Sequence, residues 1–359
     1  MKRKLNFSFA FRSFIRTFVD HNEQGHVSCE TQMRITFPFI LLLAVGCILA
    51  LPSSAQSLIR RADSLLTKMY NMGNVDTANV TRPETKWTIA VRVKESGTTI
   101  RTEGIDEGKH FESEMDATRK ATLSVCVSYL GLSLSAALNP AKLLGRYHDY
   151  ELNLNSYGRR FGFDLIYQDA KNFKGWYDQD GLERMQLEDG MLSVKTLNLN
   201  AFYVLNNRRF AYPAAFSQSY IQRRSAGGFL LAASAMGQRV VFGKEQQLRL
   251  NMTNAAVGAG YGYNYVPSRG WLLHISALPT FIVYSHTSMS YGDDNVSLRY
   301  HFPEVIVTSR GAVVHYWGNM FLGMSMLFNF TNVGHEENLA VHNIKWHVCT
   351  SFGLRLGKR

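Results

Sequence analysis

The chain is poor in cysteine and, over most of its length, lacks long apolar runs. After residue 56 no stretch reaches 18 apolar residues, which excludes a bundle of membrane-spanning helices. Of the four cysteines, only Cys126 and Cys349 follow residue 55, too few for a scaffold held by disulfide bonds. Neither lies in a metal-binding or redox motif, so we expect no metal ion and no cofactor.

One apolar run lies near the start, at residues 35–57, between a basic residue and a group of small residues. This order indicates a secretory signal peptide that begins at Met33 and is cleaved after Ala55. We interpret residues 1–32 as an upstream extension, with a long basic n-region as the alternative. Lipidation at Cys47 is a further alternative, because the residues before it faintly resemble a lipoprotein cleavage box.

The part of the chain after residue 55 is basic, with 33 Lys and Arg against 25 Asp and Glu. Basic charge often indicates a nucleic-acid partner, but export makes an anionic membrane surface or anionic sugars the better expectation. We therefore expect outer-membrane lipid and lipopolysaccharide as partners, envelope proteins as further candidates, and no nucleic acid.

From Trp87 onward, apolar and polar residues alternate, which is the pattern of strands with one apolar and one polar face. A soluble β-sandwich has strands of about 5–6 residues, whereas a transmembrane barrel needs roughly 9–11, with aromatic belts. Several segments here are that long, their polar faces carry Asn, Arg, Lys and His, and Tyr and Trp often lie near their ends. We therefore predict an all-β fold, an outer-membrane antiparallel β-barrel.

Single-chain bacterial barrels close with an even number of strands, so an odd number of candidate segments must contain a merged pair or a false one. We predict about 12 strands, with 10 or 14 as alternatives. The candidate segments are residues 86–95, 121–129, 130–137, 148–157, 159–168, 194–206, 226–236, 248–255, 257–266, 270–284, 303–316, 319–331 and 342–356.

Some stretches depart from the alternation. Residues 57–70 have helical periodicity and predict a short periplasmic helix. Two charged, glycine-containing stretches, residues 103–121 and 172–190, are predicted to be loops. The predicted parts of the chain are residues 1–55 as extension and signal peptide, residues 56–85 as periplasmic helix and linker, and residues 86–359 as barrel.

Three stretches, residues 137–168, 208–235 and 258–284, resemble a family of exported Bacteroidetes proteins. That family is catalogued as domain-of-unknown-function family 4421 and is grouped with outer-membrane β-barrels. The resemblance covers roughly residues 60–357. It implies a barrel fold and location in the cell outer membrane, and it implies no catalytic residues.

The most enzyme-like feature is a doubled His-x-Ser, formed by His274 with Ser276 and by His286 with Ser288. On a strand, residues i and i+2 share a face, so each imidazole would lie beside a hydroxyl, as a serine nucleophile meets its base. Outer-membrane phospholipases of the A1 type use such a pair on a barrel. No Asn or Asp stands at a diagnostic spacing, so we interpret these as structural pairs that line the lumen, with catalysis as the alternative.

Residues 207–228 contain four arginines between two strand segments. A short helix that begins at Pro213, an irregular strand end with a loop, and a site for an anion or lipopolysaccharide phosphate all fit this stretch. Arginine on the lipid-facing surface costs about 2–4 kcal/mol near the midplane, so all four are expected in the lumen or at the rim. These residues are Arg208, Arg209, Arg223 and Arg224.

Glycines alternate with tyrosines in residues 257–265, inside a predicted strand rather than between a strand and a helix. That context excludes a dinucleotide-binding loop and favours glycines that let a plug or loop pack against the barrel wall. Together these features predict a non-enzymatic pore, scaffold or envelope-complex subunit with a basic polar lumen. A barrel-embedded lipid hydrolase and a secreted soluble β-protein are the alternatives.

Overall fold

The computed structural model describes residues 61, 63–65, 67–68, 76–106, 108–130, 132–138, 150–171, 173–180, 183–187, 192–242, 248–291, 294–298, 304–335 and 339–358. The predicted signal peptide, with its start at Met33 and its cleavage after Ala55, and most of the helix predicted at residues 57–70 lie outside these ranges. Within them, no helix is long and apolar enough to cross a membrane.

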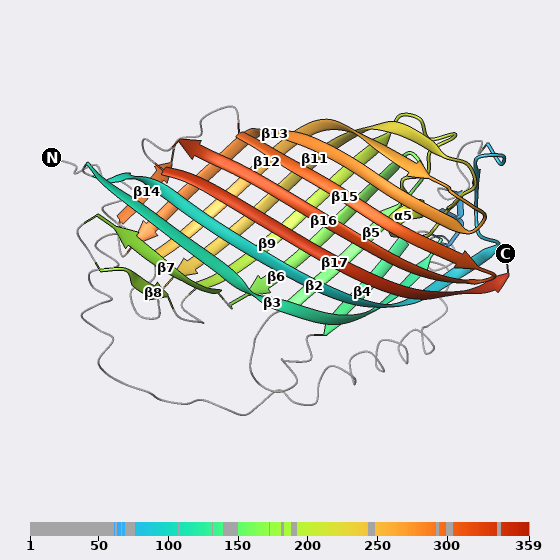
Figure 1. The fold of residues 1–359 in the computed structure, drawn as a ribbon, viewed down its shortest axis with the longest axis horizontal. Coiled ribbons are helices and arrows are strands. Elements are labelled where there is room, and N and C mark those ends of the chain that lie inside the picture. The colour runs from blue at the N-terminus through green and yellow to red at the C-terminus, as the bar shows by residue number, and fades with distance from the viewer. Residues whose placement is uncertain are drawn as a thin grey trace, which may run out of the picture. The chain divides into compact units, whose positions relative to one another are not determined.

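Twelve strands of the described part of the chain form a closed antiparallel ring (Figure 1). The ring closes because the first barrel strand pairs with both the last strand and the second one. This confirms the predicted barrel and its predicted number of strands. In sequence order the ring strands are β2 (Thr85–Asp106), β3 (Lys109–Tyr129), β4 (Leu132–Leu138), β5 (Tyr150–Tyr157), β6 (Phe161–Ala170), β9 (Leu192–Val204), β11 (Ala226–Phe242), β12 (Leu248–Tyr265), β13 (Trp271–Tyr291), β15 (Glu304–Trp317), β16 (Met320–His335) and β17 (Leu339–Lys358).

Shorter elements lie outside the ring. β14 (Asp294–Leu298) pairs with β13, and β7 (Phe173–Gln179) pairs with β3 and with β8 (Met185–Leu187). β1 (Val80–Thr81) pairs with β10 (Ile221–Gln222), and α5 (Pro213–Phe216) is a single helical turn.

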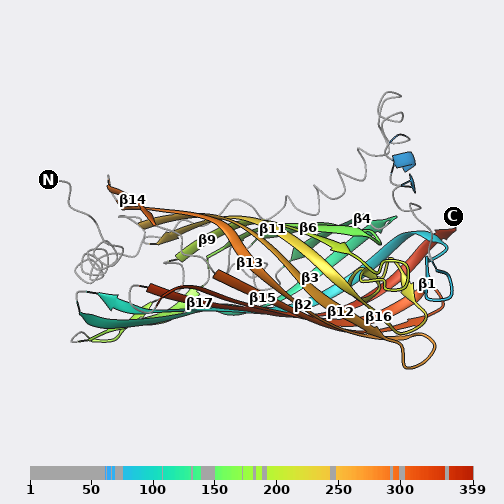
Figure 2. The same ribbon diagram turned by 90° about the horizontal axis from the view of Figure 1, so that it is seen from above.

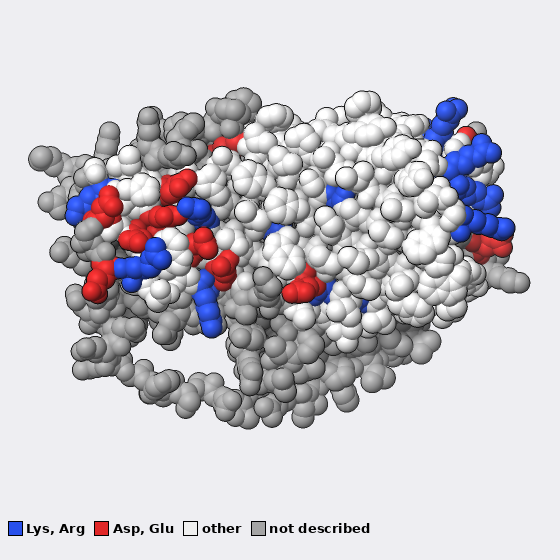
Figure 3. All heavy atoms as spheres, viewed as in Figure 1, with Lys and Arg blue, Asp and Glu red and all other residues white. Residues whose placement is uncertain are grey.

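The alternation in sequence becomes an outer apolar surface. In β2, Trp87, Ile89 and Val91 are 46%, 41% and 45% exposed, while the intervening Ala90 is buried. Each of the twelve ring strands carries at least one large apolar side chain that is exposed in this way. On the face seen in Figure 3 an almost uncharged band separates two charged ends, as expected for a surface in contact with lipid.

The surplus candidate segment is explained by β12. Residues 248–255 and 257–266 were two predicted strands, and the structure joins them into one. The register with β13 shifts between Ala255 and Ala256, because Ala255 lies opposite Tyr284 and Ala256 lies opposite Ile282. This β-bulge leaves Val283 as an extra residue in β13, so the alternation of faces in β13 reverses there.

The two predicted loops are wrong. Residues 103–106 are the end of β2 and residues 109–121 the start of β3, and residues 172–190 contain β7 and β8. Residues 111–117 of β3 pair with β7 instead of β4, so this part of the sheet extends past the ring. Charged residues of β3 alternate here with buried ones, as Glu112 does between Phe111 and Ser113, so the segment has no apolar face of the kind that lipid requires.

The two ends of the barrel differ in their connections. At the end that carries the C-terminus, short turns join β5 to β6, β12 to β13 and β15 to β16; we name it the short-turn end (Figure 1). The opposite end carries the extended β2–β3 hairpin, β7, β8 and β14; we name it the long-strand end. One connection at the short-turn end is long, namely residues 205–225 between β9 and β11, which we name the plug segment.

Candidate functional site

The plug segment folds back between the walls of the barrel, where Figure 2 shows it as the yellow-green chain near the C-terminus. Phe210 and Ala211 are 0% exposed and Tyr212 is 3% exposed. Pro213 starts helix α5, where its fixed φ suits the first turn. Gln218, with a φ of 53°, then turns the chain, and its N–H donates to the Pro213 carbonyl at 3.0 Å. The stretch therefore combines a very short helix with irregular loop.

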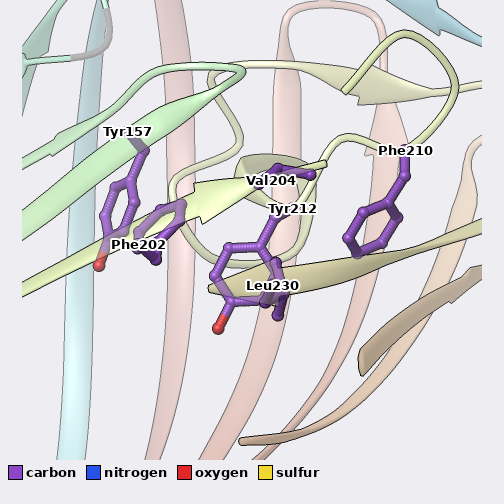
Figure 4. Packing of buried hydrophobic residues seen from close by; sticks show 6 residues of the cluster. All are labelled: Tyr157, Phe202, Val204, Phe210, Tyr212 and Leu230. Carbon is purple, nitrogen blue, oxygen red and sulfur yellow. The ribbon is translucent and has the colours of Figure 1, made fainter. Parts of the chain in front are cut away.

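Aromatic residues fix the plug segment against the wall. Phe210 and Tyr212 join a buried cluster with strand residues, as Figure 4 shows. A Cβ atom added at Gly262 would lie 3.0 Å from Phe210 Cζ and 3.3 Å from His274 Cε1. The glycine in β12 thus gives room for the plug, as its pattern in the sequence predicted. The strand residues of the cluster are Tyr157, Phe202, Val204 and Leu230.

Hydrogen bonds tie the plug segment to strands around the ring. Its backbone carbonyls accept from side chains of β12, β15 and β17, and one of its serines donates to a carbonyl of β5. The bonds are Asn264 Nδ2 to Ala211 O at 2.9 Å, Tyr316 Oη to Ala214 O at 2.7 Å, Arg355 Nη2 to Gln218 O at 2.8 Å and Ser219 Oγ to Tyr157 O at 3.4 Å.

Gln222 holds the two ends of the segment together. Its side chain is 3% exposed, and its Oε1 accepts from Ala211 N at 2.9 Å and from Asn264 Nδ2 at 3.0 Å. Its Nε2 donates to the carbonyls of Arg209 at 2.6 Å and Arg224 at 2.8 Å. One buried amide thus brings the two arginine pairs close in space.

A serine, a histidine and an asparagine form a hydrogen-bonded chain on the inner wall. His274 Nδ1 lies 2.6 Å from Asn264 Oδ1, and His274 Nε2 lies 3.0 Å from Ser276 Oγ. Asn264 on β12 stands opposite His274 on β13 in the register. A nucleophile, a base and an orienting group have this order in serine hydrolases.

Sequence reasoning missed Asn264, because the residue is distant from the pair along the chain. The turn between β12 and β13, residues 266–270, was the signal that could have found it. Pairing outward from that turn places residue 264 opposite residue 274.

The Ser276 hydroxyl is covered by the plug. His274 and Ser276 are each 5% exposed. The ring centroids of Tyr212 and Phe216 lie 5.4 and 5.0 Å from the centroid of the His274 imidazole. Burial raises the pKa of the Tyr212 phenol, against the opposing effects of Arg310 and the Ser276 hydroxyl, so the phenol stays neutral. The outer neighbours of the pair on β13 are apolar, and Ile275 is 70% exposed.

The structure does not bring the second pair to this site. His286 lies opposite Thr253 and Ser288 opposite Asn251, beyond the bulge at Val283. In the register of β12 these positions belong to the outer face, whereas His274 and Ser276 are on the inner face. No hydrogen bond joins His286 to Ser288 among the described contacts. The bulge therefore separates two pairs that a regular strand would place on one face.

The four predicted arginines are exposed at the short-turn end. Arg208 and Arg209 follow β9, and Arg223 and Arg224 precede β11. Figure 3 shows basic side chains gathered at this end and mixed charges at the other. In the part of the chain that the structure describes, no group of three His, Cys, Asp or Glu could hold a metal ion.

A closed antiparallel ring with an apolar outer surface and a polar inner face defines an outer-membrane type of β-barrel. Residues 74–355 match the family described as "Domain of unknown function (DUF4421)", and the chain belongs to this family. The resemblance predicted from sequence is confirmed, apart from its attribution to Bacteroidetes, which stays a prediction. No curated protein matches the chain.

Solved structures of outer-membrane barrels are similar in fold. The outer membrane protease OmpT from Escherichia coli is 9% identical, with 80% of this chain and 100% of that chain covered and a TM-score of 0.40. The β domain of the Bordetella autotransporter BrkA is 12% identical, with 74% and 99% covered and a TM-score of 0.32. OprG from Pseudomonas aeruginosa is 11% identical, with 76% and 97% covered and a TM-score of 0.28. These likenesses say nothing about the activity of this chain.

Proposed function

We propose that the protein is a non-enzymatic barrel of the outer membrane, closed at its short-turn end by the plug segment. Its role is that of a scaffold or an envelope-complex subunit rather than an open pore. The observation that supports this is the set of hydrogen bonds from the plug segment to β5, β12, β15 and β17. A segment held by strands on several sides of the ring leaves little room for a solute.

Side chains within the barrel support the same proposal. Lys345 Nζ on β17 donates to Gln168 Oε1 on β6 at 3.2 Å, although these strands lie far apart around the ring. The positive charges of Arg92 and Arg310 both attract the carboxylate of Asp164. Inward-facing cations of this kind favour the predicted basic lumen, narrowed by contacts between its walls.

Planar-bilayer conductance of the refolded protein tests the proposal. We expect no regular current steps from the protein, and steps from a variant in which residues 210–222 are replaced by a Gly-Ser linker of equal length. Heat-modifiable migration on gels shows whether each barrel has closed. If the linker variant does not fold, the double substitution Phe210→Gly and Tyr212→Gly loosens the plug with less change. Regular current steps from the unaltered protein, similar in size to those of the linker variant, would overturn the proposal.

The chain of Ser276, His274 and Asn264 favours a second candidate, the lipid hydrolase. In this function Ser276 is the nucleophile, His274 the base and Asn264 the orienting group, and the plug segment must move before lipid can reach them. A fluorophosphonate probe that labels active serines separates the candidates. The hydrolase predicts labelling of the linker variant that Ser276→Ala abolishes, whereas the non-enzymatic barrel predicts none in either protein.

A further inference from the structure

Two turns at the short-turn end hold an unbalanced set of charges. Residues 156–162 and 203–226 together contain six arginines and no aspartate or glutamate. Five of these arginines are exposed, and Arg159 is 4% exposed. Like charges repel one another at short range, so such a set is stabilised by an anion. The six are Arg159, Arg160, Arg208, Arg209, Arg223 and Arg224.

Contacts show that the two turns meet. The backbone N–H of Val204 donates to the Arg160 carbonyl at 2.7 Å, and Arg160 Nε donates to Asn207 Oδ1 at 3.4 Å. The Gln222 side chain joins the backbones of Arg209 and Arg224, as described above. All three pairs of arginines therefore lie around one part of the rim, beside β6, β9 and β11.

The electrostatics of Arg159 agree with this crowding. Its pKa is lowered first by burial and then by Arg82, Arg160 and Arg208, with Tyr220 acting in the opposite direction. Three guanidinium groups from three different chain segments thus act on a fourth.

An apolar surface lies directly beside the arginines on the outer wall. Phe161 on β6 stands opposite Tyr203 on β9, and these side chains are 53% and 39% exposed. Leu205 and Phe229 are 52% and 61% exposed, and the Leu205 N–H donates to the Phe229 carbonyl at 3.0 Å. Aromatic side chains followed by cations are the arrangement found where a barrel surface crosses from acyl chains to headgroups.

We infer that this rim binds anionic phospholipid in the leaflet at the short-turn end. The arginines hold the phosphate group, because guanidinium groups match its geometry, and the apolar surface of Phe161, Tyr203, Leu205 and Phe229 contacts the acyl chains. This inference does not depend on whether the plug segment closes the lumen.

Native mass spectrometry of the refolded protein in zwitterionic detergent tests the inference, with phosphatidylglycerol and phosphatidylcholine added at equal concentration. We expect preferential retention of phosphatidylglycerol. Replacement of Arg208, Arg209, Arg223 and Arg224 by Gln should weaken that retention by roughly tenfold or more. The same replacement should leave the retention of phosphatidylcholine unchanged. The matched control replaces four exposed cations of the long-strand end by Gln and should retain phosphatidylglycerol fully. Those cations are Lys174, Arg184, Arg239 and Arg249.

Two further measurements distinguish a site for lipid from a site for a free anion. Phe229→Ser should weaken binding of the intact lipid, and deacylated glycerophosphoglycerol and inorganic phosphate should compete poorly. Equal competition by either soluble anion, or an unchanged affinity in Phe229→Ser, would assign the site to a free anion and overturn the lipid assignment. Unchanged phosphatidylglycerol retention after loss of the four rim arginines would overturn the inference as a whole.

Discussion

At the short-turn end Phe210 and Tyr220 are 0% and 1% exposed inside the barrel, whereas at the long-strand end Ile105 is 48% exposed on the β2–β3 hairpin. Both regions extend the same ring of strands. In the hairpin, backbone groups of β2 and β3 bond to each other, and side chains such as Ile105 lie in solvent, although Phe111 on the other face is buried. In the plug segment the chain is irregular, so Gln222, Asn264, Tyr316 and Arg355 supply bonds that a sheet would supply by itself.

This difference shows where each end obtains its stability. Buried backbone groups must be paired, by strand neighbours or by side chains. Much of the long-strand end is held by backbone pairing, which many sequences can make, so its exposed positions should tolerate changes of side chain. The short-turn end depends on a few specific side chains, and single substitutions there should have large effects.

The largest expected effect is from Phe210→Ala. The side chain is fully buried between the plug and the wall, so its loss should reduce the free energy of unfolding by about 3–5 kcal/mol. The matched substitution at the long-strand end, Ile105→Ala, should change it by less than about 0.5 kcal/mol. Urea titration of the detergent-refolded proteins measures both, and equal losses would show that the plug contributes no packing energy.

The next effect in size is from Gln222→Ala. It removes the shared partner of the Ala211 N–H and of the Arg209 and Arg224 carbonyls. Ala211 is fully buried, so its unpaired N–H should cost about 1–3 kcal/mol. The plug should then open more often, so trypsin should cleave faster at the rim arginines. Gln186→Ala, at an exposed site in β8, is the control and should leave the cleavage rate unchanged. Equal cleavage in both variants would show that Gln222 does not hold the plug.

The sequence predicted the parts of the fold in which one side of the chain meets lipid and the other does not. Trp87, Ile89 and Val91 identify β2 because lipid requires apolar residues at every second position. The same rule failed for residues 103–121, which carry charged residues such as Glu112 and Glu114 where a lipid-facing strand carries apolar ones. It also divided β12 in two, because the large apolar residues change from even positions, such as Leu250, to odd positions, such as Tyr261, although one strand continues through both.

The candidate site was harder to predict. His274 and Ser276 are two residues apart and were found from spacing alone. Asn264 joins them through the register of β12 and β13, which the turn at residues 266–270 could have indicated. Gln222 joins them only through the return of the plug segment, which no local sequence pattern predicts. The arginines were recognised by charge, but their grouping with Arg159 and Arg160 depends on two turns that meet only in the fold.

Gly262→Ala tests the contact between the plug segment and the barrel wall, and its expected effect is smaller than that of Gln222→Ala. The new methyl group would lie 3.0–3.3 Å from Phe210, His274 and Ser276, so the plug must shift, at a cost of about 1–3 kcal/mol. Gly237 on the neighbouring β11 is the matched control, because a Cβ atom there meets nothing within 4 Å. Gly237→Ala should be neutral or slightly stabilising in the same urea titration. If both variants behaved alike, the wall at Gly262 would not be in close contact with the plug.

The smallest effect is expected at the long-strand end, from Arg101→Gln. Arg101 pairs with Glu112 across the β2–β3 hairpin, and their side chains are 50% and 27% exposed. An exposed ion pair of this kind contributes about 0–1 kcal/mol, and salt screens it, so the variant should differ little at low salt and not at all at high salt. A loss as large as that from Gln222→Ala would mean that the hairpin also depends on specific side chains, and the contrast between the ends would fail.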